Sequence, residues 1–319
     1  MGARMLRRVF LITGAGVMLA AMVAVMPATA NAAPPGQRYT WTAIDVPGSA
    51  YTIPVAVNDL QAVVGLYADA NGPNQGFIEQ GGRYTTVDYP QAVSTLAFGM
   101  SDLGEIVGEY SPSNGDNYGF IDWGGRFTTL QDPMADNVPN LGTTPQAVNI
   151  RGEIVGYYFD DTPTMHGFVY QNGQYRTLDC PGAGTGSDPS DWLTGYAGTY
   201  LGYVNDYGAI IGDCFENNGS YYGFIYQDGS YNEIPNVPGA SATYICWITD
   251  FGVTGGSYLS SNGGGVVGYV DHSGNYTTIE DPIGPYGIYV EGANNLGAMA
   301  GYYLDASGNY NGFLMTPGR

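Results

Sequence analysis

The stretch S-D-L-G-E-I-V-G-E-Y-S-P-S-N-G-D-N-Y-G-F-I-D-W-G-G-R-F-T-T-L-Q-D-P, residues 101–133, predicts the architecture of the whole chain, because most of the chain repeats it. Asp102-Leu103-Gly104 and Gly124-Gly125 have the composition of tight turns between antiparallel strands. Short apolar and β-branched runs flank these turns. They predict strands at Thr95–Met100, Glu105–Ser111, Tyr118–Trp123 and Arg126–Gln131. The unit is therefore four antiparallel strands.

A glycine followed by an aromatic residue marks each copy of this unit. The pairs are Gly76-Phe77, Gly119-Phe120, Gly167-Phe168, Gly223-Phe224, Gly268-Tyr269 and Gly312-Phe313. Successive pairs are 43, 48, 56, 45 and 44 residues apart, which makes six copies. Four strands at a period of about 45 residues are the signature of a β-propeller blade. The sequence thus predicts an all-β, six-bladed β-propeller of four-stranded antiparallel blades.

The two ends of the chain predict how the ring closes. The last copy stops at Gly312–Met315, after its third strand. Tyr39–Pro47 precedes the first copy and resembles the fourth strands at Arg83–Pro90 and Gly274–Pro282. Pairing this first strand with the last three leaves no open sheet edge. We therefore expect residues 33–319 to form one propeller domain, closed by the N-terminal strand, which completes the last blade.

Residues 1–32 have the features of an export signal peptide. A basic start with Arg7-Arg8 precedes an apolar run, and Ala30-Asn31-Ala32 is a small-residue cleavage site. A transmembrane anchor is the weaker alternative. The arginine pair also resembles a twin-arginine signal, although an ordinary Sec signal is favoured. No later apolar run reaches about 18 residues. We expect a secreted or periplasmic protein without membrane insertion after cleavage.

The charge of the chain is sparse and acidic. Only 12% of residues are charged, there are 29 acids against 9 arginines and no lysine, and the net charge is −20. Removal of the signal with its three arginines lowers the net charge to −23. Such a surface repels nucleic acid and anionic lipid. It suits cations, neutral ligands or simple solubility in an extracellular medium, and we expect a monomer.

The link between blades 3 and 4 is the longest departure from the repeat. It is an insertion at Pro181–Thr199, and it belongs to what we call the upper face, which carries the links between blades and the loops between second and third strands. Functional variation is usually found in such loops on a rigid scaffold. Because Cys180 and Cys214 should both lie near this face, we favour a disulfide between them and a buried free thiol at Cys246. Three unpaired thiols are the alternative.

The repeated elements resemble the HAF-type extracellular repeat of bacterial secreted proteins. The motif I-N-D-x-G-x-I-V-G appears here around Asn58-Asp59 and Ser101–Gly108, and H-G-F appears as His166-Gly167-Phe168. Blade 5 departs most, with Thr254-Gly255-Gly256 in place of I-V-G. The resemblance covers nearly the whole mature chain and implies an extracellular repeat protein. It implies no catalytic residue.

Aspartates recur once or more per blade on the upper face. Asp160, Asp161 and Asp179 are the candidates for a Ca²⁺ site, because this ion takes hard oxygen ligands from carboxylates and loop carbonyls. The alternative is that each aspartate caps a turn through its own backbone hydrogen bonds. The regular recurrence favours that alternative. Ca²⁺ is still the one cofactor that these aspartates suggest, and its binding should be tested.

Aromatic residues gather near the insertion and the tops of the inner strands of blades 4 to 6. These are the candidate ligand-binding residues: Trp192, Tyr196, Tyr200, Tyr244 and Tyr289, with Asp188 and Asp191 beside them. Exposed rings next to acids would suit stacking on a sugar ring. The alternative, which we weigh slightly higher, is that buried rings anchor the loops.

Three functions are compatible with this pattern. The first is a secreted binding module for carbohydrate or another neutral surface ligand on the upper face. The second is a glycoside hydrolase or polysaccharide lyase that uses carboxylates or tyrosine; a hydrolase needs two carboxylates about 5 to 9.5 Å apart. The third is a structural or adhesive surface protein. We rank binding first and assign no catalytic residue, because the two histidines, His166 and His272, are far apart and no nucleophile motif occurs.

Overall fold

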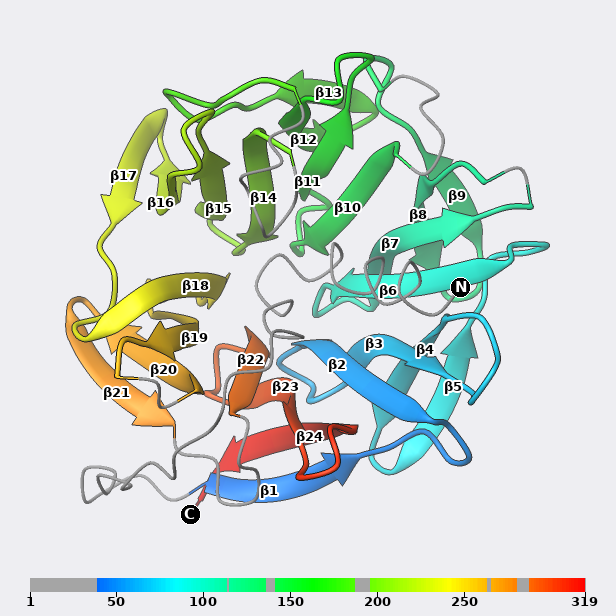
Figure 1. Ribbon diagram of the computed structural model, residues 1–319. Helices are drawn as coiled ribbons and strands as arrows, with labels where there is room; N and C mark the ends of the chain where they lie inside the picture. The colour runs from blue at the N-terminus through cyan, green and yellow to red at the C-terminus, as the bar shows by residue number, and fades with distance from the viewer. Residues whose placement is uncertain are drawn as a thin grey trace.

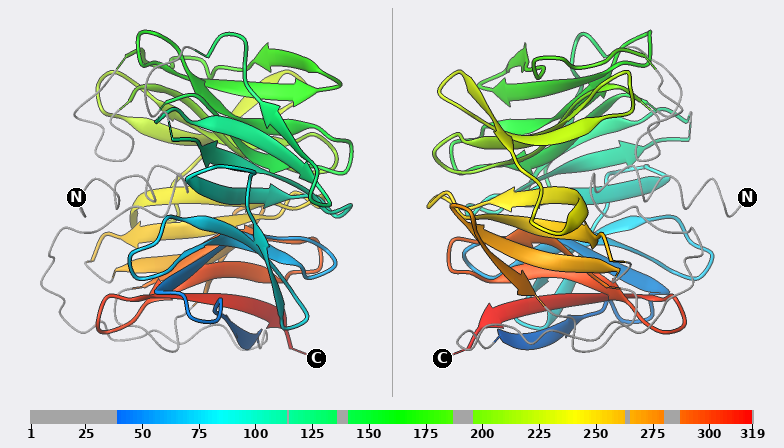
Figure 2. Two further views of the ribbon diagram at one scale, coloured as in Figure 1. Left: turned by 90° about the vertical axis from the view of Figure 1, so that its right-hand side faces the viewer. Right: turned by 60° about the vertical axis from the view of Figure 1, so that its left-hand side comes forward.

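The computed structural model describes residues 39–113, 115–135, 141–186, 196–262, 265–279 and 287–318. These residues form 24 β-strands, which are arranged as six four-stranded units around a common centre (Figure 1). We call each unit a blade. Figure 2 shows the ring from its edge, as a thick disc with loops on both faces. Within the described ranges, no helical segment has the length and hydropathy needed to span a bilayer.

The strand bounds follow the repeat. Blades 1 to 3 contain β2 (Tyr51–Val57), β3 (Val63–Ala68), β4 (Gln75–Gln80), β5 (Arg83–Val87), β6 (Ser94–Met100), β7 (Glu105–Ser111), β8 (Tyr118–Trp123), β9 (Phe127–Leu130), β10 (Thr143–Val148), β11 (Ile154–Phe159), β12 (Met165–Gln171) and β13 (Gln174–Thr177). Blades 4 to 6 contain β14 (Gly198–Val204), β15 (Ile210–Phe215), β16 (Tyr221–Gln227), β17 (Ser230–Ile234), β18 (Ala240–Ile248), β19 (Thr254–Ser260), β20 (Val266–His272), β21 (Asn275–Ile279), β22 (Ile288–Ala293), β23 (Met299–Leu304), β24 (Tyr310–Pro317) and β1 (Tyr39–Ile44). The predicted all-β, four-stranded units are confirmed.

The N-terminal strand lies in the last blade. β1 pairs antiparallel with β24, from Tyr39 opposite Pro317 to Ile44 opposite Gly312, and the sheet order is β1-β24-β23-β22. The Trp41 ring packs against Phe313 with centroids 4.9 Å apart. Figure 1 shows β1 (blue) beside β24 (red) at the rim of the ring. Strands from opposite ends of the chain thus share one sheet.

The repeated glycine in the second strand of each blade has a steric cause. A Cβ on Gly65 would lie 2.1 Å from the carbonyl oxygen of Ile53 on the first strand and 2.9 Å from the Phe77 ring. A real Cβ cannot approach a backbone oxygen so closely. The equivalent distances at Gly108, Gly156, Gly212, Gly256 and Gly301 are 1.9 to 2.3 Å. The glycine therefore lets the first strand and the buried aromatic ring of the third strand close over the second strand.

The six blades are not all separate sheets. β12 and β14 form a parallel bridge between Met165 and Gly198, which joins blades 3 and 4 into one sheet. Similar parallel bridges join Asn117 to Gly142 and Val266 to Gly287. At each of these places a glycine ends a long link and lies against the backbone of the preceding blade, where a Cβ would clash at 1.9 to 2.3 Å. The long links are thus attached to the blade that they leave.

Candidate functional site

Both ends of the 181–199 insertion are held where blades 3 and 4 meet on the upper face. The Ala197 amide donates to the carbonyl oxygen of Gly186 at 2.9 Å, so the two ends of the loop meet. The Gly186 amide donates to Thr164 Oγ1 at 2.8 Å, and the Thr185 amide donates to Asn217 Oδ1 at 2.8 Å. These contacts attach the base of the insertion to the loops that follow β11 and β15.

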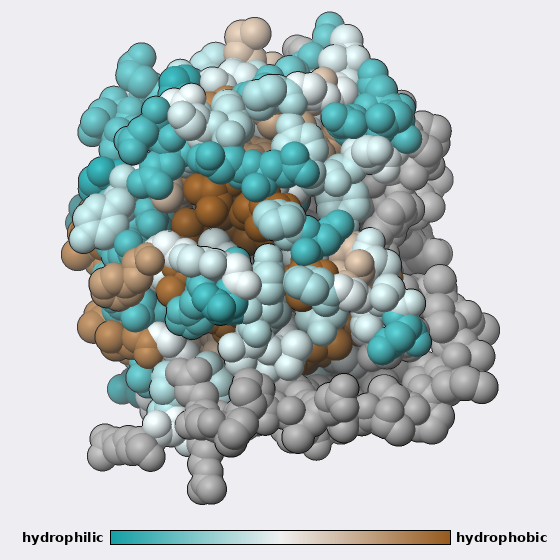
Figure 3. Space-filling model, turned by 90° about the vertical axis from the view of Figure 1, so that its left-hand side faces the viewer, coloured by the Kyte–Doolittle hydropathy of each residue, from teal (hydrophilic) through white to brown (hydrophobic). Residues whose placement is uncertain are grey.

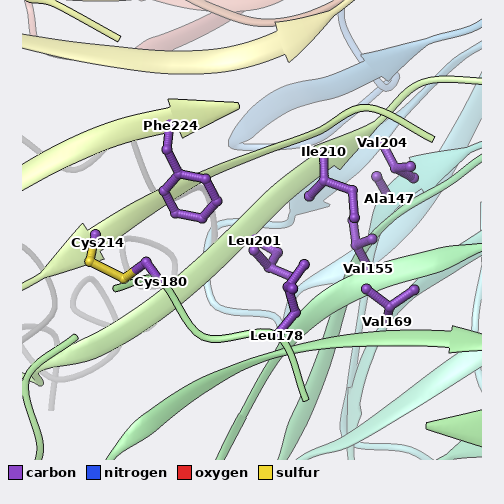
Figure 4. Close-up of a cluster of buried hydrophobic side chains, with 10 residues drawn as sticks. All are labelled: Ala147, Val155, Val169, Leu178, Cys180, Leu201, Val204, Ile210, Cys214 and Phe224. Carbon is purple, nitrogen blue, oxygen red and sulfur yellow. A yellow bond between two sulfur atoms is a disulfide. The ribbon is translucent and has the colours of Figure 1, made fainter. Parts of the chain in front are cut away.

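A disulfide fixes the start of the insertion. Cys180 and Cys214 are bonded, with their Cα atoms 5.9 Å apart, which is the pairing that the sequence favours. Figure 4 shows the bond at the edge of the buried cluster between blades 3 and 4, near Phe224 and Leu201. Cys246 is a free thiol that lines the central channel. Burial raises the pKa of the Cys246 thiol well above its usual range.

Most of the candidate tyrosines lie beneath the upper face and not on it. Tyr200, Tyr244 and Tyr289 are all buried; Tyr289 stacks on Tyr302 with centroids 4.7 Å apart. Tyr200 donates its hydroxyl to Gln146 Oε1 at 3.0 Å. An exposed stacking shelf made of these three rings is therefore wrong, because the inner strands of neighbouring blades converge and enclose them. They are anchors, which is the alternative that the sequence left open.

Tyr196 is the candidate aromatic that remains accessible. It is half-buried and packs edge-on against Phe159, with centroids 4.8 Å apart. It stands at the base of the insertion, next to Ala197. Asp188, Asp191 and Trp192 lie outside the described residues.

The predicted metal ligands are engaged with a histidine. His166 Nδ1 is 2.8 Å from Asp179 Oδ2, and its Nε2 is 3.4 Å from Asp160 Oδ2. The His166 ring also stacks on Tyr158 at 5.1 Å. Hydrogen bonding to Asp179, then to Asp160, raises the pKa of His166, and hydrogen bonds from Thr164, Thr162 and His166 lower the pKa of Asp160 despite its partial burial.

This arrangement corrects two expectations. Within the described ranges, no three His, Cys, Asp or Glu side chains are arranged to hold a metal ion. Asp161 is exposed, and the two carboxylates that contact His166 are those of Asp160 and Asp179. The sequence analysis gave His166 no place in a site, although it is the centre of the polar cluster. The signal was a histidine, in the blade that carries the insertion, at the repeat position occupied elsewhere by Gln75, Tyr118, Tyr222 and Asn311.

The central channel holds a cavity that the sequence analysis missed. Each first strand has a β-bulge, and the bulged residue lines a cavity of about 30 Å³. These residues are Val55, Phe98, Gln146, Gly202, Cys246 and Glu291. Such a cavity has room for about two water molecules. An alignment of the six first strands that includes the bulge would have revealed which residue of each strand lines the cavity.

Two acids are buried around this cavity. Asp213 and Glu291 are 4% and 7% exposed, and burial raises the pKa of each to about 8. Asp213 Oδ1 and Gln146 Nε2 have no hydrogen-bond partner within the described residues. A carboxylic acid with a raised pKa suits general acid chemistry. The cavity is much smaller than a sugar ring, however, so the acids cannot reach a polysaccharide there.

Comparisons with known proteins support the fold. No protein-family model and no curated protein matches the sequence. Among solved structures, an Aleuria aurantia lectin mutant in complex with Fucα1-6GlcNAc aligns with a TM-score of 0.51 at 11% identity, covering 85% of this chain and 96% of the lectin. SapL1 lectin in complex with α-methyl fucoside aligns at 0.50 and 12% identity, over 80% and 88% of the two chains.

A third solved structure is not described as a lectin. TolB from Acinetobacter baumannii aligns with a TM-score of 0.50 at 11% identity, covering 85% of this chain and 65% of TolB. At these identities the similarity concerns the fold alone. The chain thus shares the β-propeller fold with proteins that are not all described as lectins, and its function has to be argued from its own side chains.

Proposed function

We propose that the protein is a secreted β-propeller that binds a carbohydrate on its upper face, at the base of the 181–199 insertion. The observation that carries the proposal is the cluster of His166, Asp160 and Asp179. Its side chains are 23 to 33% exposed and stand beside the insertion. Carboxylates and imidazoles at a surface can exchange several hydrogen bonds with adjacent hydroxyl groups. The ligands in the two lectin complexes favour a sugar as the ligand class.

The cluster is held in place before any ligand arrives. Asp160 Oδ1 accepts hydrogen bonds from the Thr162 and Thr164 amides, each at 2.9 Å, and Asp179 Oδ1 accepts one from the Gly167 amide at 3.1 Å. Polar groups fixed in this way lose little freedom on binding. Tyr196 offers a half-buried ring nearby. In this proposal Trp192, Asp188 and Asp191 complete the site from the insertion, and Tyr200, Tyr244 and Tyr289 support it from below.

Several further parts of the sequence prediction belong to the proposal. Residues 1–32 direct Sec-type export, the mature chain acts as a monomer, and the repeats belong with the HAF-type extracellular repeats. Pairing of β1 with β24 closes the ring in solution. A polysaccharide-degrading enzyme and an adhesive surface protein are the alternatives, and the small size of the channel cavity argues against the buried acids Asp213 and Glu291 as an enzyme site.

A glycan array probed with the chain from residue 33 onward tests the proposal, with and without Ca²⁺. We expect binding to at least one neutral glycan that is weakened about tenfold or more by His166→Ala, Asp179→Asn or Tyr196→Ala. Gln75→Ala changes the equivalent of His166 in a blade without the insertion and serves as the matched control. Glycan binding that the three variants leave unchanged would disprove this site. Release of reducing ends from a bound glycan would favour the enzyme.

A further inference from the structure

The lower face, opposite the insertion, carries a ring of exposed apolar side chains. The turn that follows each first strand places one large residue in solvent, and we call these residues the crown. They are Leu60, Leu103, Tyr207, Phe251 and Leu296, with Ile150 one position earlier in blade 3. All but Ile150 are 62 to 78% exposed. These five residues occupy one repeat position around the same end of the channel, and Ile150 lies next to it.

Exposure of this kind is not explained by the fold. Tight turns favour Gly, Asn, Asp and Ser, and the turn residues on either side of the crown are of these types, except Gln61 and Arg151. A large apolar side chain in the middle of such a turn adds nothing to the core. Soluble proteins rarely group exposed apolar residues unless they form an interaction site. Figure 3 views the rim of the ring and shows hydrophobic residues exposed along its left-hand margin, on the side of these turns.

A cavity of about 40 Å³ lies inside the crown and is lined by carboxylates. Asp59, Asp102, Asp206 and Asp250 come from the same turns, each one residue before the crown residue. Each of them accepts a hydrogen bond from a residue of a neighbouring blade, either from a backbone N–H or from an amide group of Asn295. One example is the bond of 2.7 Å from the Asp59 amide to Asp102 Oδ1. We call this cavity the basin. Tyr203 lines both the basin and the channel cavity above it.

The basin carries more negative charge than its surroundings balance. Arg151 is the one basic residue in the six turns, and it pairs with Glu153 at 3.0 Å. Burial raises the pKa of Asp102 and of Asp206, and repulsion by neighbouring carboxylates adds to the rise. No hydrogen bond to the Oδ2 atoms of Asp102 and Asp206 is formed by the described residues. These oxygens can therefore accept hydrogen bonds from an incoming cationic group.

We propose that the lower face docks a segment of a partner protein in which a Lys or Arg side chain enters the basin and large apolar neighbours lie on the crown. The charge of the basin selects a cation, and the crown selects the apolar residues around it. An anionic membrane surface would be repelled by the same carboxylates. The site is separate from the insertion on the upper face, so it does not depend on the proposed carbohydrate function.

A labelled peptide, Gly-Leu-Lys-Leu-Gly with blocked ends, tests this by fluorescence anisotropy on the chain from residue 33 onward. We expect it to bind about tenfold or more tightly than peptides with Glu for Lys or with Ser for both Leu residues, and to bind more weakly at high salt. The double variants Asp102→Asn/Asp206→Asn and Tyr207→Ser/Phe251→Ser should each weaken binding about tenfold. Asparagine keeps Oδ1 as an acceptor, so the first variant should fold.

Trp123→Ser is the matched control, because Trp123 is an exposed apolar residue at the outer rim, beside the turn between the third and fourth strands. It should bind the lysine peptide as the wild type does. Equal binding of the glutamate peptide, or no binding of the lysine peptide at millimolar concentration, would overturn the proposal. So would binding to phosphatidylcholine vesicles in place of the peptide, or self-association that Phe251→Ser abolishes.

Discussion

Asn294 Nδ2 donates a hydrogen bond to the carbonyl oxygen of Asn58 at 2.8 Å, although 236 residues separate the two in the chain. The same bond joins blades that are consecutive in sequence: Asn149 donates to Asn205 at 2.9 Å, and Asn205 donates to Thr249 at 3.0 Å. Beside it, the Asn295 amide donates to Asp59 Oδ1 at 2.8 Å. Blades 6 and 1 thus meet at the channel in the same way as blades that are consecutive in the sequence.

The first prediction concerns this contact between blades 6 and 1. Asn294→Ala and Asn205→Ala remove equivalent side chains, each of which donates to a carbonyl of the next blade and accepts two amides of its own turn. Each variant should lower the free energy of unfolding by about 1 to 3 kcal/mol, because these buried groups lose their partner. Urea unfolding of the two variants measures the effect, and equal losses are expected if blades 6 and 1 meet in solution. A clearly smaller loss for Asn294→Ala than for Asn205→Ala would show that they do not.

The second prediction concerns the N-terminal strand. Deletion of residues 39–47 removes β1 and leaves β24 as an open sheet edge. We expect unfolding at a lower temperature together with aggregation, because unpaired edges template association. Thermal unfolding monitored with light scattering measures both. Trp41→Ala, which removes the contact with Phe313 but leaves the strand pairing, should lower stability without aggregation. Unchanged unfolding of the deletion variant would contradict a structural role for β1.

The blades could be read from the sequence because their repeat has a local steric cause. Gly65 and its equivalents contact the first strand and the aromatic ring of the third strand, so the spacing of glycine and ring follows from the blade itself. The position of β1 could be predicted because it fills a missing strand. The parallel bridge at Gly198 could not, since it depends on how a long link crosses to the preceding blade.

The candidate site was harder to predict because exposure depends on contacts between blades. Tyr244 and Tyr289 have the composition of a binding shelf, but neighbouring inner strands enclose them. The crown shows the opposite case. Phe251 and Tyr207 would ordinarily be assigned to a core, and they are exposed because none of the described residues covers their turns. The available signal was a large apolar or aromatic residue that directly follows an Asp or Asn at this turn position in five of the six blades.

The third prediction concerns the disulfide. Cys180 and Cys214 are 34 residues apart, and a crosslink over such a loop should contribute about 3 to 4 kcal/mol to stability by restricting the unfolded chain. The Cys180→Ala/Cys214→Ala variant should lose this amount in urea unfolding and become insensitive to reductant. Cys246→Ala keeps the crosslink and should remain sensitive to reductant. A non-reducing peptide map with three free thiols in exported protein would refute the pairing.

The fourth prediction uses the raised pKa of His166. Asp179 and Asp160 flank its ring, Tyr158 stacks on it, and His166 in turn acts on the carboxyl of Asp132. Because the pKa of His166 is higher in the folded state, its stabilising effect is complete below about pH 6.5 and is lost as the pH rises through the folded value. The wild type should therefore lose about 1 kcal/mol of stability over this pH range, a small loss because the cluster is partly exposed. His166→Asn should not show this loss. Identical pH profiles for wild type and variant would contradict this.

The last prediction concerns the acids in the channel. Burial raises the pKa of Asp213 to about 8, so the folded state binds its proton more tightly than the unfolded state does. Stability should therefore fall as the pH rises from about 4 to about 8, because the unfolded state releases the proton first. Asp213→Asn keeps the shape of the side chain without the charge. It should match the stability of the wild type near pH 4 and exceed it by up to about 5 kcal/mol at pH 9.

Glu291→Gln should act in the same direction, since burial also raises the pKa of Glu291 to about 8. Asp161→Asn, at an exposed position, is the control and should leave the profile unchanged. Urea unfolding at pH 4, 7 and 9 separates these outcomes, and parallel profiles for wild type and Asp213→Asn would show that the channel carboxyl stays ionised.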